Sequence, residues 1–204
     1  MKITLAEKNR NNKMVRIYID DSYSFTIPVE DYIRNNLYEE VEIDEQKLEE
    51  IRNKVLVQAA RERGVRFLTF KDRSVNELFK KLMEVGFDEE VANKATEYLT
   101  TIGYLDDNRY AMRYLSERIR TKALSKRSLE YELKNKGIAD ELINKAMSEF
   151  EIDDYQVALR EAKRKFGKYN MQDKKVEQRA CRFLLHRGFS YELVNKVMKE
   201  MKDS

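Results

Sequence analysis

The sequence repeats one helix-ending pattern at intervals of 51 residues. Gly86, Gly137 and Gly188 each follow a leucine by four positions and precede an apolar residue. Glycine adopts the left-handed conformation that ends many helices at little cost, and the two flanking apolar side chains make the contact that accompanies such an ending. An Asn-Lys pair follows each glycine at the same offset. Three endings in register predict tandem helical repeats.

The central repeat, residues 103–150, divides into three helices. Asp106 and Asp107 place carboxylates at the electropositive start of the first helix, and apolar residues then recur at helical spacing. Ser125 is a capping residue for the second helix, which Gly137 ends, and the third begins near position 139 or 140. Each repeat is too small to bury much surface alone, so neighbouring repeats should stack.

The repeats on either side have similar signals. Caps are expected at Ser74, where Glu77 completes a capping box, and at Asp88 and Ser190. The first helical unit is predicted to begin at Asp44. All six glycines are expected at helix ends: Gly64, Gly86, Gly103, Gly137, Gly167 and Gly188.

The first 28 residues instead alternate apolar and polar side chains, which is typical of strands. Residues 14–19 and 22–27 follow this period of two, with a break at Asp20-Asp21. Residues 3–8 could pair as a third strand after a turn through residues 9–12. Residues 31–38 then form a short linking helix at most.

These patterns predict a mainly α fold. Three tandem three-helix repeats would form an elongated curved body, preceded by a small N-terminal antiparallel β element. The predicted boundaries are 1–40 for the β element and 41–103, 104–150 and 151–204 for the repeats.

Charge is unevenly distributed, although the net charge of the 204 residues is only +3. Residues 20–50 hold eleven acidic and two basic residues, residues 103–137 hold nine basic and five acidic, and residues 160–187 hold ten basic and three acidic. A single charged run is usually a solvated helix face. An acidic head before a basic middle and tail indicates contact with nucleic acid or an acidic protein surface.

The sequence lacks the patterns that carry catalysis or cofactor binding. It contains no GxxxxGK[ST], GxGxxG or GxSxG. His186 is the single histidine and Cys181 the single cysteine; we interpret both as structural, with the thiol buried and inert. Helix capping accounts for the two aspartate pairs, Asp106-Asp107 and Asp153-Asp154. We therefore predict a protein without enzymatic activity, cofactor or metal.

No stretch approaches the roughly 20 apolar residues of a membrane span. Residues 1–4 begin no signal peptide, and one cysteine suits a reducing compartment. A cytoplasmic protein that does not bind membranes is expected.

The candidate binding residues are cations of the central repeat. Three arginines share the face of helix 106–122 that is opposite to Tyr110 and Tyr114, and three further cations extend this positive field into the next helix. The six residues are Arg109, Arg113, Arg120, Lys122, Lys126 and Arg127. Arginine suits carboxylates in a protein groove and phosphates alike. A solvated helix with local ion pairs is the competing interpretation, and the two tyrosines are read as core.

Residues 103–111, GYLDDNRYA, followed by R-x-L-x-x-E-L-x-x-K-G at 127–137, resemble the RecX family of regulators of the RecA recombinase. Residues 73–82 and 182–189 are similar to the cores of that family's first and third repeats. The resemblance covers about residues 60–204. The matching motif positions are Asp106, Asp107, Arg109, Tyr110, Arg127, Glu132, Leu133, Lys136 and Gly137.

The resemblance implies a monomeric, non-enzymatic protein that binds the groove of the RecA filament on single-stranded DNA. It would modulate, and usually inhibit, the ATPase, strand-exchange and coprotease activities of RecA. Arg109 and Arg127 could face the partner, whereas Tyr110, Leu133 and Gly137 are structural. One departure is that residues 122–126 contain no glycine where the family often has them.

Two other functions fit the same sequence. A stand-alone DNA-binding protein could place the second or third helix of each unit in a groove, although +3 is a modest charge for that role. A peptide-binding helical scaffold fits the repeats but leaves the basic face unexplained.

Overall fold

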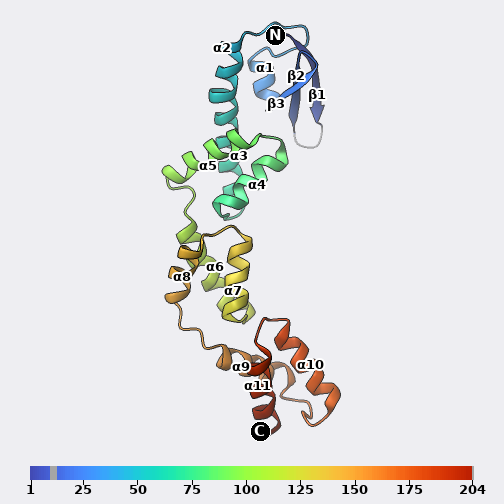
Figure 1. Ribbon diagram of the computed structural model, residues 1–204, viewed down its shortest axis with the longest axis vertical. Coiled ribbons are helices and arrows are strands. Elements are labelled where there is room, and N and C mark those ends of the chain that lie inside the picture. The colour runs from blue at the N-terminus through green and yellow to red at the C-terminus, as the bar shows by residue number, and fades with distance from the viewer. Residues whose placement is uncertain (10–12, 204) are drawn as a thin grey trace. The chain divides into compact units, whose positions relative to one another are not determined.

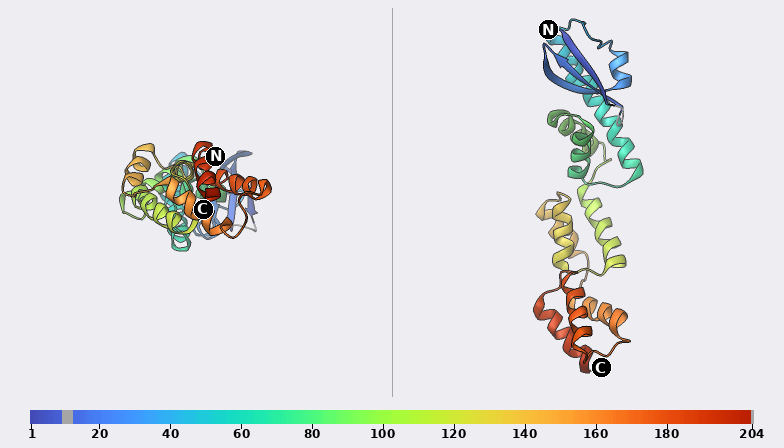
Figure 2. Two further views of the ribbon diagram at one scale, coloured as in Figure 1. Left: turned by 90° about the horizontal axis from the view of Figure 1, so that it is seen from below. Right: turned by 90° about the vertical axis from the view of Figure 1, so that its right-hand side faces the viewer.

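The computed structural model describes residues 1–9 and 13–203 (Figures 1 and 2). Three strands come first and helices follow. Contacts group the chain into two compact units, Met1–Asp106 and Asp107–Ser204. The predicted mainly helical fold with a small N-terminal antiparallel sheet is confirmed. The division into four segments at 1–40, 41–103, 104–150 and 151–204 stays a prediction.

The strands β1 (Ile3–Asn9), β2 (Met14–Ile19) and β3 (Ser22–Pro28) form one antiparallel sheet in the order β1-β2-β3. Val15 pairs with Ile27 and Ile17 with Phe25, so the apolar side of the predicted alternation is buried. Asp20 makes the β2–β3 turn together with its neighbour, and both have positive φ, as short hairpin turns require. The three predicted strands are confirmed, whereas most of the predicted turn, residues 10–12, lies outside the described residues.

A short helix, α1 (Val29–Arg34), follows the sheet directly. It begins two residues before the linking helix predicted from position 31, because Pro28 supplies the backbone conformation that precedes a helix. It ends well before position 38, and Asn36 has a φ of 52°.

The first helical unit starts with one long helix made of α2 (Glu45–Glu50), the π-helical segment η1 (Ile51–Leu56) and α3 (Val57–Phe70). The unit begins at Asp44, as predicted, and this residue caps the helix by accepting a 2.7 Å hydrogen bond from the amide of Lys47. The sheet lies against this helix (Figure 2, right). The helices α4 (Val75–Val85) and α5 (Glu89–Thr101) complete the unit.

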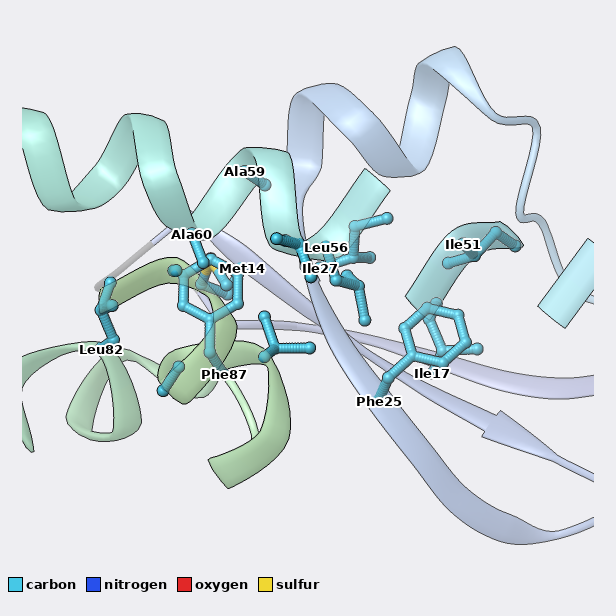
Figure 3. Close-up of a cluster of buried hydrophobic side chains, with 14 of the residues drawn as sticks. Met14, Ile17, Phe25, Ile27, Ile51, Leu56, Ala59, Ala60, Leu82 and Phe87 are labelled. Carbon is cyan, nitrogen blue, oxygen red and sulfur yellow. The ribbon is translucent and has the colours of Figure 1, made fainter. Parts of the chain in front are cut away.

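The sheet and the first helical unit share one hydrophobic core (Figure 3). The sheet contributes Met14, Ile17, Phe25 and Ile27, the long helix contributes Ile51, Leu56, Ala59 and Ala60, and α4 and the following turn contribute Leu82 and Phe87. A lone hairpin is marginal in water, and a small sheet gains stability from a third strand or from packing against a helix. Packing on the helices therefore gives it the buried face that it needs.

Gly64 does not end a helix, so that prediction was wrong. It lies inside α3, where an added Cβ would sit 2.8 Å from Cδ1 of Leu99 and 3.4 Å from Cδ2 of Leu78. The missing side chain lets α3 approach α4 and α5 closely. Gly64 is thus a packing glycine rather than a helix terminator.

Residues 107–203 of the second unit form six helices. They are α6 (Asp107–Lys122), α7 (Lys126–Asn135), α8 (Asp140–Ser148), α9 (Asp154–Phe166), α10 (Lys174–Leu185) and α11 (Tyr191–Asp203). The helices α6–α8 enclose one core around Leu115, Leu129 and Leu133, and α9–α11 enclose another around Leu184 and Val197. Each group of three is therefore a small domain with its own apolar centre.

The predicted caps at Ser74, Asp88, Ser125 and Ser190 are present. Ser125 accepts from the amide of Ser128, Ser190 from that of Leu193 and Asp88 from that of Val91. Ser74 and Glu77 form the reciprocal capping box.

The repeated glycines have the predicted conformation. The φ angles of Gly86, Gly137 and Gly188 are 112°, 76° and 83°. In each repeat, the amide of the residue after the glycine donates a hydrogen bond to the carbonyl of the leucine four positions before the glycine. The three leucines are fully buried. Gly103 is also left-handed, whereas Gly167 ends α9 with an ordinary φ of −61°.

Candidate partner-binding surface

Three of the predicted arginines lie on one exposed face of α6. Arg109, Arg113 and Arg120 are exposed, and their positions fall within about 40° around the helix axis at 100° per residue. The helical period therefore correctly predicts that these arginines share one exposed face of α6. Two of them, Arg109 and Arg113, also interact with other groups of the chain.

The opposite side of α6 carries a closed polar and aromatic cluster. The rings of Tyr110 and Tyr114 stack with centroids 6.0 Å apart. The Tyr114 hydroxyl donates a 2.7 Å hydrogen bond to Glu132 and accepts one of 2.9 Å from Nε of Arg118, which also pairs with Glu132 at 2.9 Å. Burial, followed by the hydrogen bond to Glu132, raises the pKa of Tyr114 to about 12. The tyrosines belong to the core, as predicted.

The motif E-L-x-x-K-G at 132–137 fastens α7 to α6. Glu132 binds Tyr114 and Arg118, and Leu133 is fully buried. The Lys136 ammonium lies 5.0 Å from the centroid of the Tyr114 ring, within range of a cation–π interaction. Together with the left-handed Gly137, these positions stabilise the domain.

The other three candidate cations surround the loop between α6 and α7. Lys122 is about 140° around α6 from Arg109, so it does not share the arginine face. Lys126 and Arg127 are exposed in the first turn of α7. Between these groups, Ala123 is held at a φ of 43°, in the region where glycine is preferred. The loop that lacks the family's glycines therefore still adopts a glycine-like backbone.

This loop contacts the third group of helices. The Ser125 amide donates to the carbonyl of Arg187 at 3.1 Å, and the Arg187 guanidinium donates to the carbonyl of Lys122. Asp154 accepts a 2.9 Å hydrogen bond from the Lys126 amide. The two residues of the Asp153-Asp154 pair therefore have different roles. Asp153 caps α9, as predicted, whereas Asp154, in the third repeat, binds the start of α7 in the second repeat.

The six candidate residues predicted from the sequence include none from the third repeat, although residues 160–187 hold ten basic and three acidic residues. The structure places Lys175, Arg179 and Arg182 in a row on the exposed face of α10. Their spacing of four and three residues was the signal that could have identified them.

The single histidine and the single cysteine lie on α10 or at its end. His186 is exposed at the end of α10. Cys181 is half-buried rather than fully buried, and this burial raises the pKa of its thiol. Within residues 1–9 and 13–203, no group of three His, Cys, Asp or Glu residues could hold a metal. The same described residues include no helix long and apolar enough to cross a membrane.

Three family models match successive parts of the chain. They describe the first, second and third three-helix domains of RecX and match residues 60–99, 106–147 and 151–198. The chain belongs to the RecX family. The three RecX domains coincide with the three helical groups, so the predicted three-helix repeats and the predicted family are both confirmed.

Curated RecX relatives match along nearly the whole chain. The regulatory protein RecX of Clostridium acetobutylicum is 30% identical, with 96% of this chain and 93% of the relative covered. The protein of the same name from Clostridium botulinum (strain Alaska E43 / Type E3) is 26% identical over 98% and 95%. These RecX relatives are named as regulatory proteins, and a regulatory role follows for this chain.

Solved RecX structures show the same fold. A crystal structure of regulatory protein RecX covers 100% of this chain at 26% identity with a TM-score of 0.63. The crystal structure of RecX from Lactobacillus salivarius covers 74% at 18% identity with a TM-score of 0.61. The latter likeness concerns the fold alone.

Proposed function

We propose that the chain regulates the RecA recombinase without catalysis of its own. It binds in the groove of the RecA filament on single-stranded DNA and inhibits the ATPase, strand-exchange and coprotease activities of the filament. The observation that carries this proposal is the match of all three helical groups to the three domains of one regulatory family. A monomer located in the cytoplasm is part of the same proposal.

The exposed cations of the second domain supply the contact surface in this proposal. Arg109, Arg113 and Arg120 form the face on α6, while Lys126 and Arg127 open α7. A guanidinium can bind a carboxylate of a protein groove or a phosphate of the strand with two parallel hydrogen bonds. A filament groove offers both kinds of anion. Lys122 contributes its charge from another side of α6.

ATP hydrolysis by the cognate recombinase on single-stranded DNA tests the regulatory role. We expect the wild-type chain to slow hydrolysis at low salt. The double variant Arg120→Glu/Arg127→Glu should inhibit at least tenfold less well, because two cations of the surface become anions. The charge-matched variant Lys145→Glu/Lys196→Glu, on exposed positions of α8 and α11, should inhibit like the wild type. An unchanged rate with saturating wild-type protein would reject the proposal.

Co-sedimentation separates the filament regulator from a stand-alone DNA-binding protein. The regulator should pellet with the recombinase filament and much less with the same DNA alone. Equal pelleting with both would favour the DNA-binding function.

Light scattering of the free protein tests whether the chain is a monomer. A measured mass of about twice 24.4 kDa would count against a monomer.

A further inference from the structure

The third RecX domain contains ten basic residues between positions 160 and 187, and the structure engages several of them internally. Lys163 pairs with Glu200 at 3.0 Å and Arg164 with the buried Glu161 at 2.6 Å. The ammonium of Lys165 lies 4.1 Å from the centroid of Phe183. These cations of α9 therefore serve the packing of the domain.

The cations of α10 are arranged differently. Lys175, Arg179, Arg182 and His186 follow one another at intervals of four, three and four residues, so they fall within about 60° around the helix and extend over about 16 Å. All four side chains are exposed. The opposite side of α10 (Figure 1, orange-red) buries Ala180 and Leu184 in the domain core.

Among the residues that the structure describes, no carboxylate forms an ion pair with Lys175, Arg179 or Arg182. Asp173 uses its carboxylate to cap α10 through the Lys175 amide at 2.8 Å. Glu177 lies on another side of the helix and pairs with Lys202 at 2.6 Å. The row is a continuous positive ridge.

The chemistry of the ridge fits a chain of phosphates better than a protein surface. Protein interfaces are enriched in arginine but depleted in lysine, and their centres depend on buried aromatic or apolar anchors. Apart from His186, the α10 row consists of cations, and it includes no such anchor. A helix seated in a duplex groove meets backbones on both sides, whereas here the positive charge follows one line. One nucleic-acid strand presents a matching single line of negative charge.

We propose that the α10 ridge of Lys175, Arg179 and Arg182 binds the phosphate backbone of single-stranded DNA. This inference rests on the proposed function, because the recombinase filament would present that strand. It assigns the strand contact to the third domain, with binding that is independent of base sequence. Arg182 is partly preoriented, since its Nε donates a 3.4 Å hydrogen bond to the carbonyl of Gln178.

Fluorescence anisotropy with a dye-labelled oligothymidylate and the full chain, without recombinase, tests the ridge. We expect wild-type binding at 50 mM NaCl that weakens steeply as salt rises. In Lys175→Gln/Arg179→Gln/Arg182→Gln, affinity at 50 mM NaCl should fall at least tenfold. The slope of log K against log salt should become shallower by about 2, at about 0.7 for each phosphate that the protein no longer neutralises. Glutamine preserves helix propensity, and circular dichroism checks the fold.

A matched control removes the same charge elsewhere. Lys145→Gln/Lys196→Gln/Lys199→Gln changes three exposed lysines on α8 and α11 and should alter affinity less than twofold. Equal reductions in affinity in both triple variants would overturn the proposal, since net charge alone would then explain binding. Absence of wild-type binding at 50 mM NaCl would also overturn it.

A competitor distinguishes DNA from an acidic protein surface. Unlabelled oligothymidylate should displace the probe at much lower charge-equivalent concentrations than polyglutamate. Equal competition would overturn the assignment to DNA and favour an acidic protein partner. Since no recombinase is present, these outcomes are separate from the ATPase test of the proposed function.

Discussion

The amide of Ser125 donates a 3.1 Å hydrogen bond to the backbone carbonyl of Arg187, which joins the α6–α7 loop to the turn between α10 and α11. The Arg187 side chain adds a hydrogen bond to the carbonyl of Lys122 and lies 3.7 Å from the buried carboxylate of Glu161. Gly188 completes the junction. The second and third domains are therefore linked through specific backbone groups as well as by the connecting chain.

Substitution of Gly188 should be more destabilising than its backbone angle alone explains. A Cβ at this position would lie 1.9 Å from Oγ of Ser128 and 2.7 Å from Oγ of Ser125. The left-handed φ of 83° costs a non-glycine residue about 1–2 kcal/mol. We expect Gly188→Ala to lower the free energy of unfolding of this unit by about 3 kcal/mol or more, measured by hydrogen exchange in urea.

Gly103 provides the control for that prediction. Its φ is 78°, but a Cβ there would meet nothing within 4 Å. Gly103→Ala should therefore show the backbone cost alone, about 1–2 kcal/mol. Adding Ser128→Ala to Gly188→Ala should recover part of the stability. Equal costs at the two glycines would show that the close approach to Ser128 is unimportant.

Removal of the Arg187 guanidinium should destabilise the junction. Glu161 is only 3% exposed and pairs with both Arg187 and Arg164. In Arg187→Met, the one remaining ion pair of Glu161 among the described residues is with Arg164, whose side chain is 70% exposed. An incompletely paired buried charge is costly, and we expect stability to fall by about 2 kcal/mol with faster exchange of the Ser125 amide. Combining Arg187→Met with Glu161→Gln should cost less than the sum of the single changes. Strict additivity would contradict the coupling.

Ala123 should tolerate glycine better than any β-branched residue. Its φ of 43° is strained for alanine, and relief of that strain offsets the extra flexibility that glycine gives the unfolded chain. We expect Ala123→Gly to change stability by less than about 1 kcal/mol, and Ala123→Val to reduce it by about 2 kcal/mol, because a β-branched residue is more strained at positive φ. Thermal unfolding of the three proteins gives the order, and valine matching alanine would refute the argument.

Tyr114 should make stability depend on pH in the alkaline range. Its pKa is raised to about 12 in the folded protein, against about 10 for an unperturbed tyrosine. Between these values the unfolded chain binds fewer protons at this position, so the stabilising contribution is complete below about pH 10 and is lost as pH rises through about 12. Tyr114→Phe should lack this component. Parallel alkaline unfolding curves for the two proteins would count against it.

The candidate surface was only partly predictable. Helical period placed Arg109, Arg113 and Arg120 on one face, because the rotation per residue is fixed by local geometry. The helical period does not show which cations form ion pairs within the chain. Arg118, in the same helix, is held by Glu132 from α7, and on α9 Lys163 is held by Glu200, 37 positions away. Which cations remain exposed for a partner depends on these distant carboxylates.

The sequence by itself determined the features that depend on neighbouring residues: the strands, the capped helix starts and the left-handed endings at Gly86, Gly137 and Gly188. Such features need only the conformational preferences and hydrogen bonds of a few consecutive residues. The tertiary structure alone decided that Gly64 leaves room for the side chain of Leu99 and that Asp154 accepts a hydrogen bond from α7. Both contacts join segments that only folding brings together. The same long-range packing made Gly188 both a helix ending and a point of contact between two domains.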